Sequence, residues 1–242
     1  MAQTVARPFA VFDIDGTLIR WQLYHAMGDA LVKTGAVPKA NFQIVREARL
    51  NWKKRQASDS FQQYEAAMVA LFQQTLHGLK IQDFENVAQS VFDEYKDQVY
   101  TYTRDLIRTL KQKNYLLFAI SGSPDIIVGK LAGYYGFDDF AASRYETKQA
   151  IFTGHVDLAV GQKEKILKTL IDKHQATTHG SIAVGDGEGD IDMLASVEHP
   201  IAFNPSQQLI RVAMKRHWPI IVERKNVVYR LDYVDKAYRL SL

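Results

Sequence analysis

Short apolar runs alternate with amphipathic segments along most of the chain. Three runs rich in β-forming residues cover residues 9–14, 115–120 and 181–184, and each is followed by a polar turn that contains glycine. A short apolar run that ends in a turn signal is typical of a buried strand. A further strand is predicted at residues 197–203. The pattern therefore predicts four strands, with residues 219–222 as a candidate fifth.

The segments between these runs have helical spacing. Apolar positions predict helices over residues 124–135, 163–174 and 206–217, the first with Pro124 at its start and Ser123 as its cap. Strands that alternate with helices form parallel βαβ units. We therefore expect an α/β fold with a Rossmann-like, doubly wound parallel sheet. Ligands bind outside the carboxyl ends of the strands in such sheets, which is where the polar turns lie.

Residues 20–100 follow a different pattern, with long helical periodicity and a single proline. Their apolar residues form two stripes, one at Phe61, Tyr64, Met68, Leu71 and Phe72, and one at Val87, Val91, Tyr95 and Val99. Stripes at this spacing predict amphipathic helices. We expect a four-helix cap over residues 20–100, inserted into an α/β core of residues 1–19 and 101–242. A small hairpin is also expected over residues 147–156.

Composition narrows the class of protein. Of the 242 residues, 47% are hydrophobic and 24% are charged, which is typical of a globular chain. The net charge of +3 is too small to predict nucleic-acid binding. The sequence has no cysteine, which excludes disulfides and thiolate chemistry, and its longest apolar run is too short to cross a membrane. We expect a cytoplasmic protein that binds neither nucleic acid nor membrane.

Four carboxylates follow the first and third predicted strands. Asp13 and Asp15 are two residues apart, so both side chains can face one site, and Asp186 and Asp190 follow the third strand. Carboxylates placed together repel one another unless a cation is bound or a pKa is raised. Oxygen-rich ligation without thiols suits Mg²⁺, which also accepts phosphate oxygens as ligands. These residues therefore predict a Mg²⁺ site.

Groups that can bind a phosphate follow the second predicted strand and lie at the start of a later predicted helix. Ser121 and the amides of the turn beginning at Gly122 precede a predicted helix N-terminus, where anions bind favourably. Lys163, near the start of another helix, can place a positive charge against these anions. Each feature alone is more often structural, but together they favour phosphate chemistry. A dinucleotide site at Gly185 and Gly187 is disfavoured, because Asp190 occupies the position of the third glycine.

This constellation resembles the haloacid dehalogenase-like superfamily of hydrolases. Residues 13–18 match its first motif, Ser121 the second, Lys163 the third and residues 185–190 the fourth. The resemblance covers residues 7 to about 222, and the helical insertion looks like the small α-helical cap of the phosphoserine phosphatase subclass. The fourth motif departs from phosphoserine phosphatases at Gly189, where those enzymes usually have Asn.

The resemblance implies a phosphatase that acts on a small phosphorylated metabolite. In this scheme Asp13 is the nucleophile that forms an aspartyl-phosphate, and Asp15 is the general acid and base. Mg²⁺ is held by Asp13, the Asp15 carbonyl and Asp186, with Asp190 as a ligand or a support. Lys163 offsets the charge of Asp13, and Ser121 binds the phosphoryl group. A phosphotransferase with the same intermediate and a non-catalytic binding protein on the same fold remain alternatives.

The substrate is less determined by sequence. Phosphoserine phosphatases carry a Glu after the first motif that holds the substrate ammonium, and that place falls at or near Gln22 here. A neutral amide cannot make the charge-assisted contact, so we expect phosphoserine to be a poor substrate. Arg46, Arg49 and Lys53 lie at helical spacing on one cap face. If that face turns inward it favours an anionic or polyhydroxyl substrate; otherwise it is a solvated surface.

Overall fold

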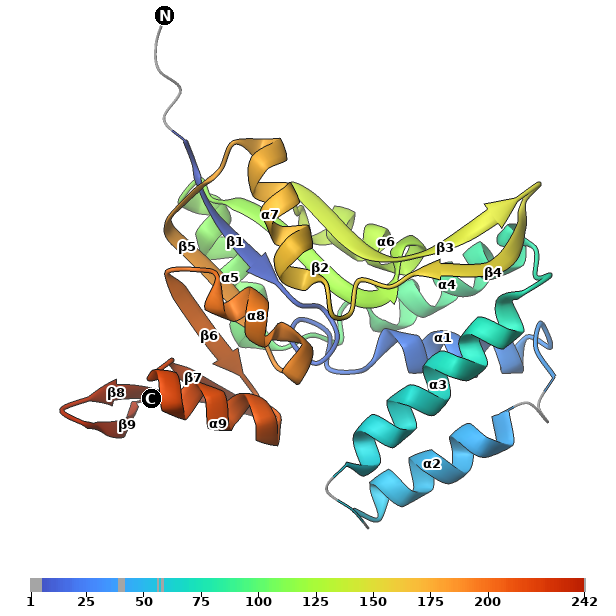
Figure 1. Cartoon of the computed structure of the whole chain (residues 1–242), viewed down its shortest axis with the longest axis horizontal. Helices are drawn as coiled ribbons and strands as arrows, with labels where there is room; N and C mark the ends of the chain where they lie inside the picture. The colour runs from blue at the N-terminus through green and yellow to red at the C-terminus, as the bar shows by residue number, and fades with distance from the viewer. Residues whose placement is uncertain (1–5, 39–41, 56, 58, 242) are drawn as a thin grey trace, which may run out of the picture.

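A mixed sheet forms the centre of the molecule. The computed structural model describes residues 6–38, 42–55, 57 and 59–241, and within them the sheet has nine strands in the order β4-β3-β2-β1-β5-β6-β7-β8-β9 (Figure 1). The strands are β1 (Pro8–Phe12), β2 (Leu116–Pro124), β3 (Asp139–Lys148), β4 (Ile151–Asp157), β5 (Thr177–Gly185), β6 (His199–Phe203), β7 (Ile220–Arg224), β8 (Val227–Val234) and β9 (Ala237–Ser241). The six strands from β3 to β7 in this order are parallel, and antiparallel strands flank them on both sides. The predicted α/β fold with a doubly wound parallel sheet is confirmed.

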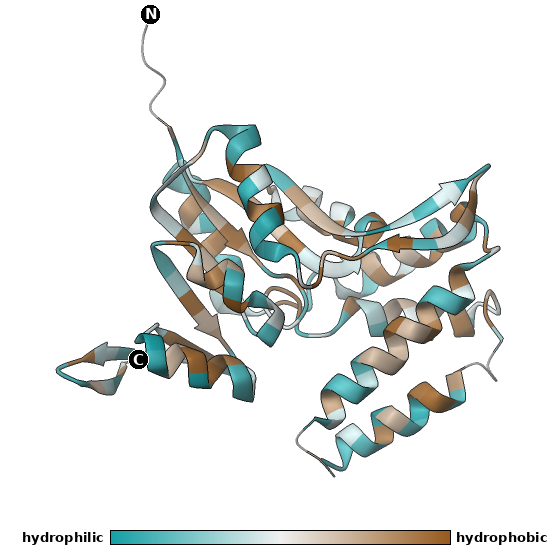
Figure 2. Ribbon diagram, viewed as in Figure 1, coloured by the Kyte–Doolittle hydropathy of each residue, from teal (hydrophilic) through white to brown (hydrophobic). Residues whose placement is uncertain are grey.

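Helices cover both faces of the sheet. Phe9 and Val11 of β1 belong to one buried apolar cluster, and Ala10 and Phe12 belong to another on the opposite face. This two-sided burial explains why the central strands read as continuous apolar runs, which are brown in Figure 2. The core helices are α5 (Thr101–Gln112), α6 (Asp125–Tyr135), α7 (Lys163–His174), α8 (Ile191–Ala195) and α9 (Gln207–Arg216), with a 3-10 turn over Glu188–Asp190.

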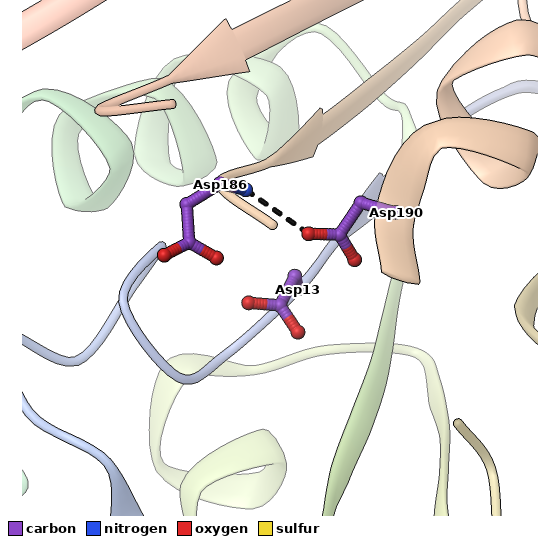
Figure 3. Close-up of side chains that lie close together, drawn as sticks. All are labelled: Asp13, Asp186 and Asp190. Atoms are coloured by element: carbon purple, nitrogen blue, oxygen red, sulfur yellow. Dashed lines mark hydrogen bonds between the residues drawn. The ribbon is translucent and has the colours of Figure 1, made fainter. Parts of the chain in front are cut away.

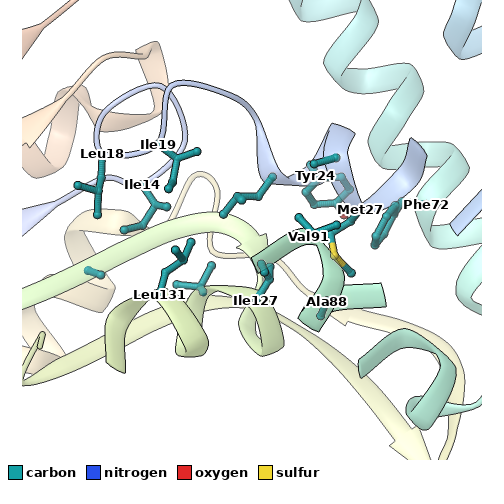
Figure 4. Packing of buried hydrophobic residues seen from close by; sticks show 14 of the residues in the cluster. Ile14, Leu18, Ile19, Tyr24, Met27, Phe72, Ala88, Val91, Ile127 and Leu131 are labelled. Atoms are coloured by element: carbon teal, nitrogen blue, oxygen red, sulfur yellow. The ribbon is translucent and has the colours of Figure 1, made fainter. Parts of the chain in front are cut away.

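Four helices between β1 and α5 form the inserted layer in the described part of the chain. They are α1 (Leu23–Lys33), α2 (Gln43–Lys53), α3 (Ser60–Leu76) and α4 (Ile81–Tyr95). The predicted stripe of α3 is buried at Tyr64, Met68, Leu71 and Phe72. Figure 4 shows side chains of α1, α3 and α4 packed beside Ile127 and Leu131 of α6. The helical periodicity of this segment is therefore confirmed, and its apolar face is continuous with the core.

Three local features differ from the sequence-based expectations. Pro124 is the N-cap of α6 rather than its first residue, and Ser123 does not cap it. The hairpin expected over residues 147–156 is longer, because β3 begins at Asp139, where it pairs with β2. A second antiparallel hairpin, β8–β9, follows β7 and was not predicted. Its Tyr238 hydroxyl lies 2.9 Å from the carbonyl oxygens of Ala213 and Trp218, which tie the hairpin to the core.

None of the helices in the described ranges combines the length and the apolar character that a membrane crossing requires.

Candidate active site

The polar turns after β1 and β5 and the start of α7 meet at the carboxyl edge of the sheet. Asp13 follows β1, Asp186 follows β5, and Asp190 closes the 3-10 turn after it. Figure 3 shows the three carboxylates directed toward one another, and one oxygen of each lies within 4.8 Å of the others. The sequence-predicted acidic cluster is therefore assembled in the structure.

Lys163 is the cation of this cluster. It is the first residue of α7, and its Nζ donates to Asp13 Oδ1 at 2.7 Å and to Asp190 Oδ1 at 2.6 Å. All three side chains are buried. Burial opposes the charge of Lys163, but the two carboxylates raise its pKa overall. A buried charge is stable only when it is paired, so Lys163 and its partners depend on one another.

Asp190 also organises the turn that carries Asp186. Its Oδ2 accepts hydrogen bonds from the backbone amides of Asp186 at 3.0 Å and of Gly187 at 2.9 Å. Gly185 makes room for this side chain, because a Cβ there would lie 2.6 Å from Asp190 Cγ. Both oxygens of Asp190 are thus engaged by the protein itself. The geometry makes Asp190 a support for Lys163 and Asp186.

Asp13 and Asp186 keep oxygens that are available to a cation. Asp13 Oδ2 is buried without a hydrogen-bond partner, and the carboxylate of Asp186 accepts no hydrogen bond from the residues that the structure describes. Burial raises the pKa of Asp13 to about 7 and also raises that of Asp186, with neighbouring carboxylates adding to both shifts. The carboxylates of Asp13, which is buried, and Asp186, which is half-buried, are a donor set that fits Mg²⁺.

Asp15 is held in a separate position beside this cluster. Its Oδ1 accepts from the Leu23 amide at 2.5 Å, and its Oδ2 accepts from the Ser121 hydroxyl at 2.8 Å. Burial raises the pKa of Asp15, while these two donors oppose the shift. A carboxyl group whose pKa is raised can carry a proton at a higher pH than usual, as a general acid must.

The second predicted motif lies at a bulge in β2. The register with β3 shifts between Ser121 and Pro124, which takes Gly122 and Ser123 out of the regular ladder. Ser121 Oγ accepts from the Ser123 amide at 3.0 Å, and the Gly122 carbonyl accepts from the Ser143 hydroxyl at 2.7 Å. Gly122 lies close to the chain after β4, since a Cβ there would lie 2.7 Å from Val160 Cγ2.

The basic face of α2 is mainly solvated. Arg46 and Lys53 are exposed, whereas Arg49 is half-buried, pairs with Asp29 at 3.0 Å and lies over the Trp21 ring. The condition that this face turns inward as a whole is therefore not met. Sequence reasoning missed a half-buried acid, Glu65 of α3. The signal that could have identified it is its position on the helix, one helical turn from buried positions of the apolar stripe.

The chain is similar to a known protein family and to proteins whose names describe their activity. The family model described as haloacid dehalogenase-like hydrolase matches residues 10–195. A phosphoserine phosphatase of Lactococcus lactis is 28% identical over 235 residues, which cover 96% of this chain and 97% of that protein. A phosphoserine phosphatase of Mycobacterium tuberculosis is 28% identical over 206 residues, which cover 84% of this chain. The alignment spans only 46% of the Mycobacterium protein.

A solved structure shares the fold. A phospho-aspartyl intermediate analogue of phosphoserine phosphatase superposes with a TM-score of 0.61 at 23% identity, covering 91% of this chain and 95% of the other. The family match spans most of the chain and includes the turns that carry Asp13, Asp15, Ser121, Lys163 and Asp186. These findings confirm the resemblance drawn from the motifs and the prediction of a phosphatase-related enzyme. The chain belongs to the haloacid dehalogenase-like hydrolase family, with phosphoserine phosphatases among its relatives.

Proposed function

We propose that the protein is a Mg²⁺-dependent phosphatase that hydrolyses a small phosphorylated metabolite through an aspartyl-phosphate on Asp13. The observation that carries this proposal is the difference between the hydrogen-bond environments of two neighbouring carboxylates. Asp13 is bound by Lys163 and keeps one oxygen without a partner, whereas Asp15 is held apart by the Leu23 amide and Ser121. The phosphatases among the relatives support the same reaction class.

The first half-reaction forms the covalent intermediate. The Asp13 carboxylate attacks phosphorus, a new bond to its oxygen forms, and the bond from phosphorus to the alcohol oxygen breaks. Asp15, whose pKa is raised by burial, gives its proton to the departing oxygen. Lys163 stays paired with Asp13 and Asp190 and offsets the negative charge of the carboxylate as it approaches the phosphate.

The second half-reaction returns the enzyme to its starting state. Asp15, now a carboxylate, takes a proton from water while the water oxygen attacks phosphorus. The bond between phosphorus and Asp13 breaks, and inorganic phosphate leaves. Splitting the hydrolysis into two displacements replaces one difficult step by two easier ones.

The metal and phosphate groups have candidate ligands in this chain. Asp13, Asp186 and the main-chain oxygen of Asp15 would hold Mg²⁺, and Asp190 would keep Asp186 in place through the turn amides. When bound, Mg²⁺ would neutralise carboxylate charge and polarise the phosphoryl oxygens. Ser121 and the amides at Gly122 would bind the transferring phosphoryl group near the N-terminus of α6.

The chain divides in this proposal into a core of residues 1–19 and 101–242 and a cap of residues 20–100 that closes over a small substrate. Closure of such a cap excludes water and macromolecules from the reaction. A cytoplasmic location, expected from the sequence without cysteine, is part of the same proposal.

A steady-state assay with p-nitrophenyl phosphate tests this function. We expect turnover with Mg²⁺, loss of turnover with EDTA and restoration by added Mg²⁺. Asp13→Asn should abolish turnover, and Asp172→Asn, on the exposed face of α7, should leave it unchanged. Turnover that persists in Asp13→Asn or in EDTA would exclude the proposal. Phosphate transferred to an added alcohol in place of water would instead identify a phosphotransferase.

A further inference from the structure

Ser143 of β3 joins two segments that contribute to the proposed catalytic site. Its side chain is fully buried. Its hydroxyl donates a hydrogen bond to the Gly122 carbonyl oxygen at 2.7 Å and accepts one from the Ala159 amide at 3.2 Å. Gly122 lies in the bulge of β2 that follows Ser121, and Ala159 lies in the segment that leads to Lys163. One hydroxyl group therefore connects the second motif to the third.

The first of these bonds orients the peptide group between Gly122 and Ser123. The Ser143 hydroxyl binds the carbonyl oxygen of this group, and the N–H of the same group donates to Ser121 Oγ at 3.0 Å. The carbonyl and the N–H of a planar trans peptide point in opposite directions, so a bond at each end fixes the plane of the group. Ser143 thus sets the conformation of the bulge that the proposed function assigns to phosphoryl binding.

The second bond holds the segment that precedes α7. The Ala159 carbonyl accepts from the Gln162 amide at 3.2 Å, and Gln162 is the N-cap of α7, which begins with Lys163. Val160 in the same turn approaches Gly122 so closely that a Cβ added to the glycine would lie 2.7 Å from Val160 Cγ2. This turn and the bulge therefore lie against each other, and one hydroxyl bonds both.

A buried serine can also have a purely structural role, and Ser181 of β5 is an example in this chain. Its Oγ accepts from the Glu198 amide at 3.1 Å, and it bonds to none of the proposed catalytic residues in the part of the chain that the structure describes. Burying a hydroxyl costs free energy unless it is hydrogen-bonded, and both serines meet that condition. Ser143 differs because its partners belong to the site.

Building on the proposed phosphatase function, we infer that Ser143 is a positioning residue for phosphoryl binding. It acts through the peptide group at Gly122 and does not contact the reacting atoms itself. Lys163 is also held by its two carboxylate partners, so the bulge depends on Ser143 more than Lys163 does. Loss of the hydroxyl should therefore weaken binding of the phosphoryl group in the ground state and the transition state alike. A loss of that kind raises KM and leaves kcat nearly unchanged.

The dissociation constant of inorganic phosphate, measured by titration calorimetry with Mg²⁺, tests this inference together with the kinetics of p-nitrophenyl phosphate. In Ser143→Ala we expect this constant and KM to rise about tenfold, as for the loss of one buried hydrogen bond, with kcat within about threefold of wild type. Ser143→Cys keeps a weak donor and should show a smaller rise. Ser181→Ala removes an equally buried hydroxyl, so it should lower the free energy of unfolding but change neither constant.

Specific results would overturn this inference. It is wrong if Ser143→Ala binds phosphate as tightly as the wild type, if kcat alone falls, or if Ser181→Ala weakens phosphate binding to the same extent. In those cases the proposed function stands, because the wild type still hydrolyses the ester. If Ser143→Ala does not fold, Ser143→Cys decides: weaker phosphate binding supports the inference and unchanged binding overturns it. A wild type that neither hydrolyses the ester nor binds phosphate would contradict the proposed function as well.

Discussion

Gly16 meets two constraints at the turn after Asp15. Its φ of +81° is in the left-handed region, and a Cβ there would lie 2.2 Å from Asp186 Oδ2. A side chain at this position would therefore strain the backbone and displace a proposed metal ligand. The glycine that follows the acidic pair is required by the geometry of the carboxylate cluster as well as by the turn.

We expect Gly16→Ala to weaken Mg²⁺-dependent turnover by about tenfold or more, because displacement of Asp186 costs more than the roughly 1 kcal/mol of backbone strain alone. The Mg²⁺ concentration that gives half-maximal activity should rise. Gly35→Ala is the matched control, since Gly35 also has a positive φ, of +76°, but no atom within 4 Å of the added Cβ. Equal loss in both variants would show that strain, and not the contact with Asp186, is responsible.

We expect His25 to make the stability of the fold sensitive to acid. It is buried against Tyr64, its Nδ1 has no hydrogen-bond partner, and burial lowers its pKa to about 3, with the charge of Arg49 adding to the shift. Below the ordinary pKa of 6.5 the unfolded chain binds a proton that the folded chain does not bind. The stability that depends on neutral His25 is therefore present above pH 6.5 and is lost as the pH falls from there toward 3.

The variant His25→Phe should lessen this loss. Between pH 6.5 and 4.5 we expect the free energy of unfolding to fall less steeply than in the wild type, by up to about 1.4 kcal/mol per pH unit. Urea unfolding at several pH values measures the slopes. The same substitution at exposed His77 should leave the slope unchanged. Parallel slopes for wild type and His25→Phe would contradict this account.

At the scale of elements, Glu223 joins the end of β7 to the start of α5. Its two carboxylate oxygens accept from the backbone amides of Thr101 at 3.0 Å and Tyr102 at 2.9 Å, and the side chain is 5% exposed. Amides of the first helical turn have no partner inside the helix, so this carboxylate satisfies two of them. It also carries the charge that the positive end of the helix dipole favours.

Glu223→Ala should lower the free energy of unfolding by about 2 kcal/mol, because two partly buried amides of the first helical turn lose their acceptor. Glu223→Gln keeps one acceptor oxygen and should lower it by less. Urea denaturation of the purified variants measures both values. A change in Glu223→Ala no larger than that in Glu85→Ala, a control on α4, would contradict the capping role.

Sequence predicted the elements that are buried on two sides better than those that are not. The strands β1, β2 and β5 were recognised because two-sided burial leaves an unbroken apolar run. The hairpin β8–β9 was missed because its residues are half-buried or exposed and mix apolar with charged side chains. Its pairing with β7 is set by tertiary contacts, among them those of Tyr238.

The residues of the candidate site also differ in how far the sequence could predict their positions. Asp13, Asp15, Ser121, Lys163 and Asp186 were predictable because each lies in a motif at the end of a strand or the start of a helix. The sequence left Asp190 as a ligand or a support, because its spacing does not show which amides its second oxygen meets. Glu65 was missed because its position depends on how α3 packs on α1.

At the scale of the whole molecule, the inserted helices α1 to α4 and the elements around the sheet share one apolar cluster. Tyr24 of α1, Phe72 of α3, Tyr145 of β3 and Ile127 of α6 belong to it. Figure 4 labels Tyr24, Phe72 and Ile127. Phe72 lies 6.0 Å from the ring of Tyr145, and the hydroxyls of Tyr24 and Tyr145 are in contact. Units joined by a continuous apolar cluster lose burial together when either unit unfolds.

We therefore expect a single cooperative unfolding transition. Calorimetry should give a calorimetric enthalpy equal to the van't Hoff enthalpy, and near-ultraviolet and far-ultraviolet circular dichroism should report the same midpoint. Phe72→Ala should lower that midpoint without splitting the transition. Two separate transitions in the wild type would show that residues 20–100 unfold independently of the core.

The proposed function rests on a covalent phosphoryl group at Asp13. The direct measurement is an acid quench during turnover of p-nitrophenyl phosphate with Mg²⁺, followed by peptide mass spectrometry that locates the modified residue. We predict a phosphoryl group on Asp13, more of it in Asp15→Asn, which should slow hydrolysis of the intermediate, and none in Asp13→Asn. Turnover without phosphorylation of Asp13, or with the phosphoryl group on another residue, would contradict the account.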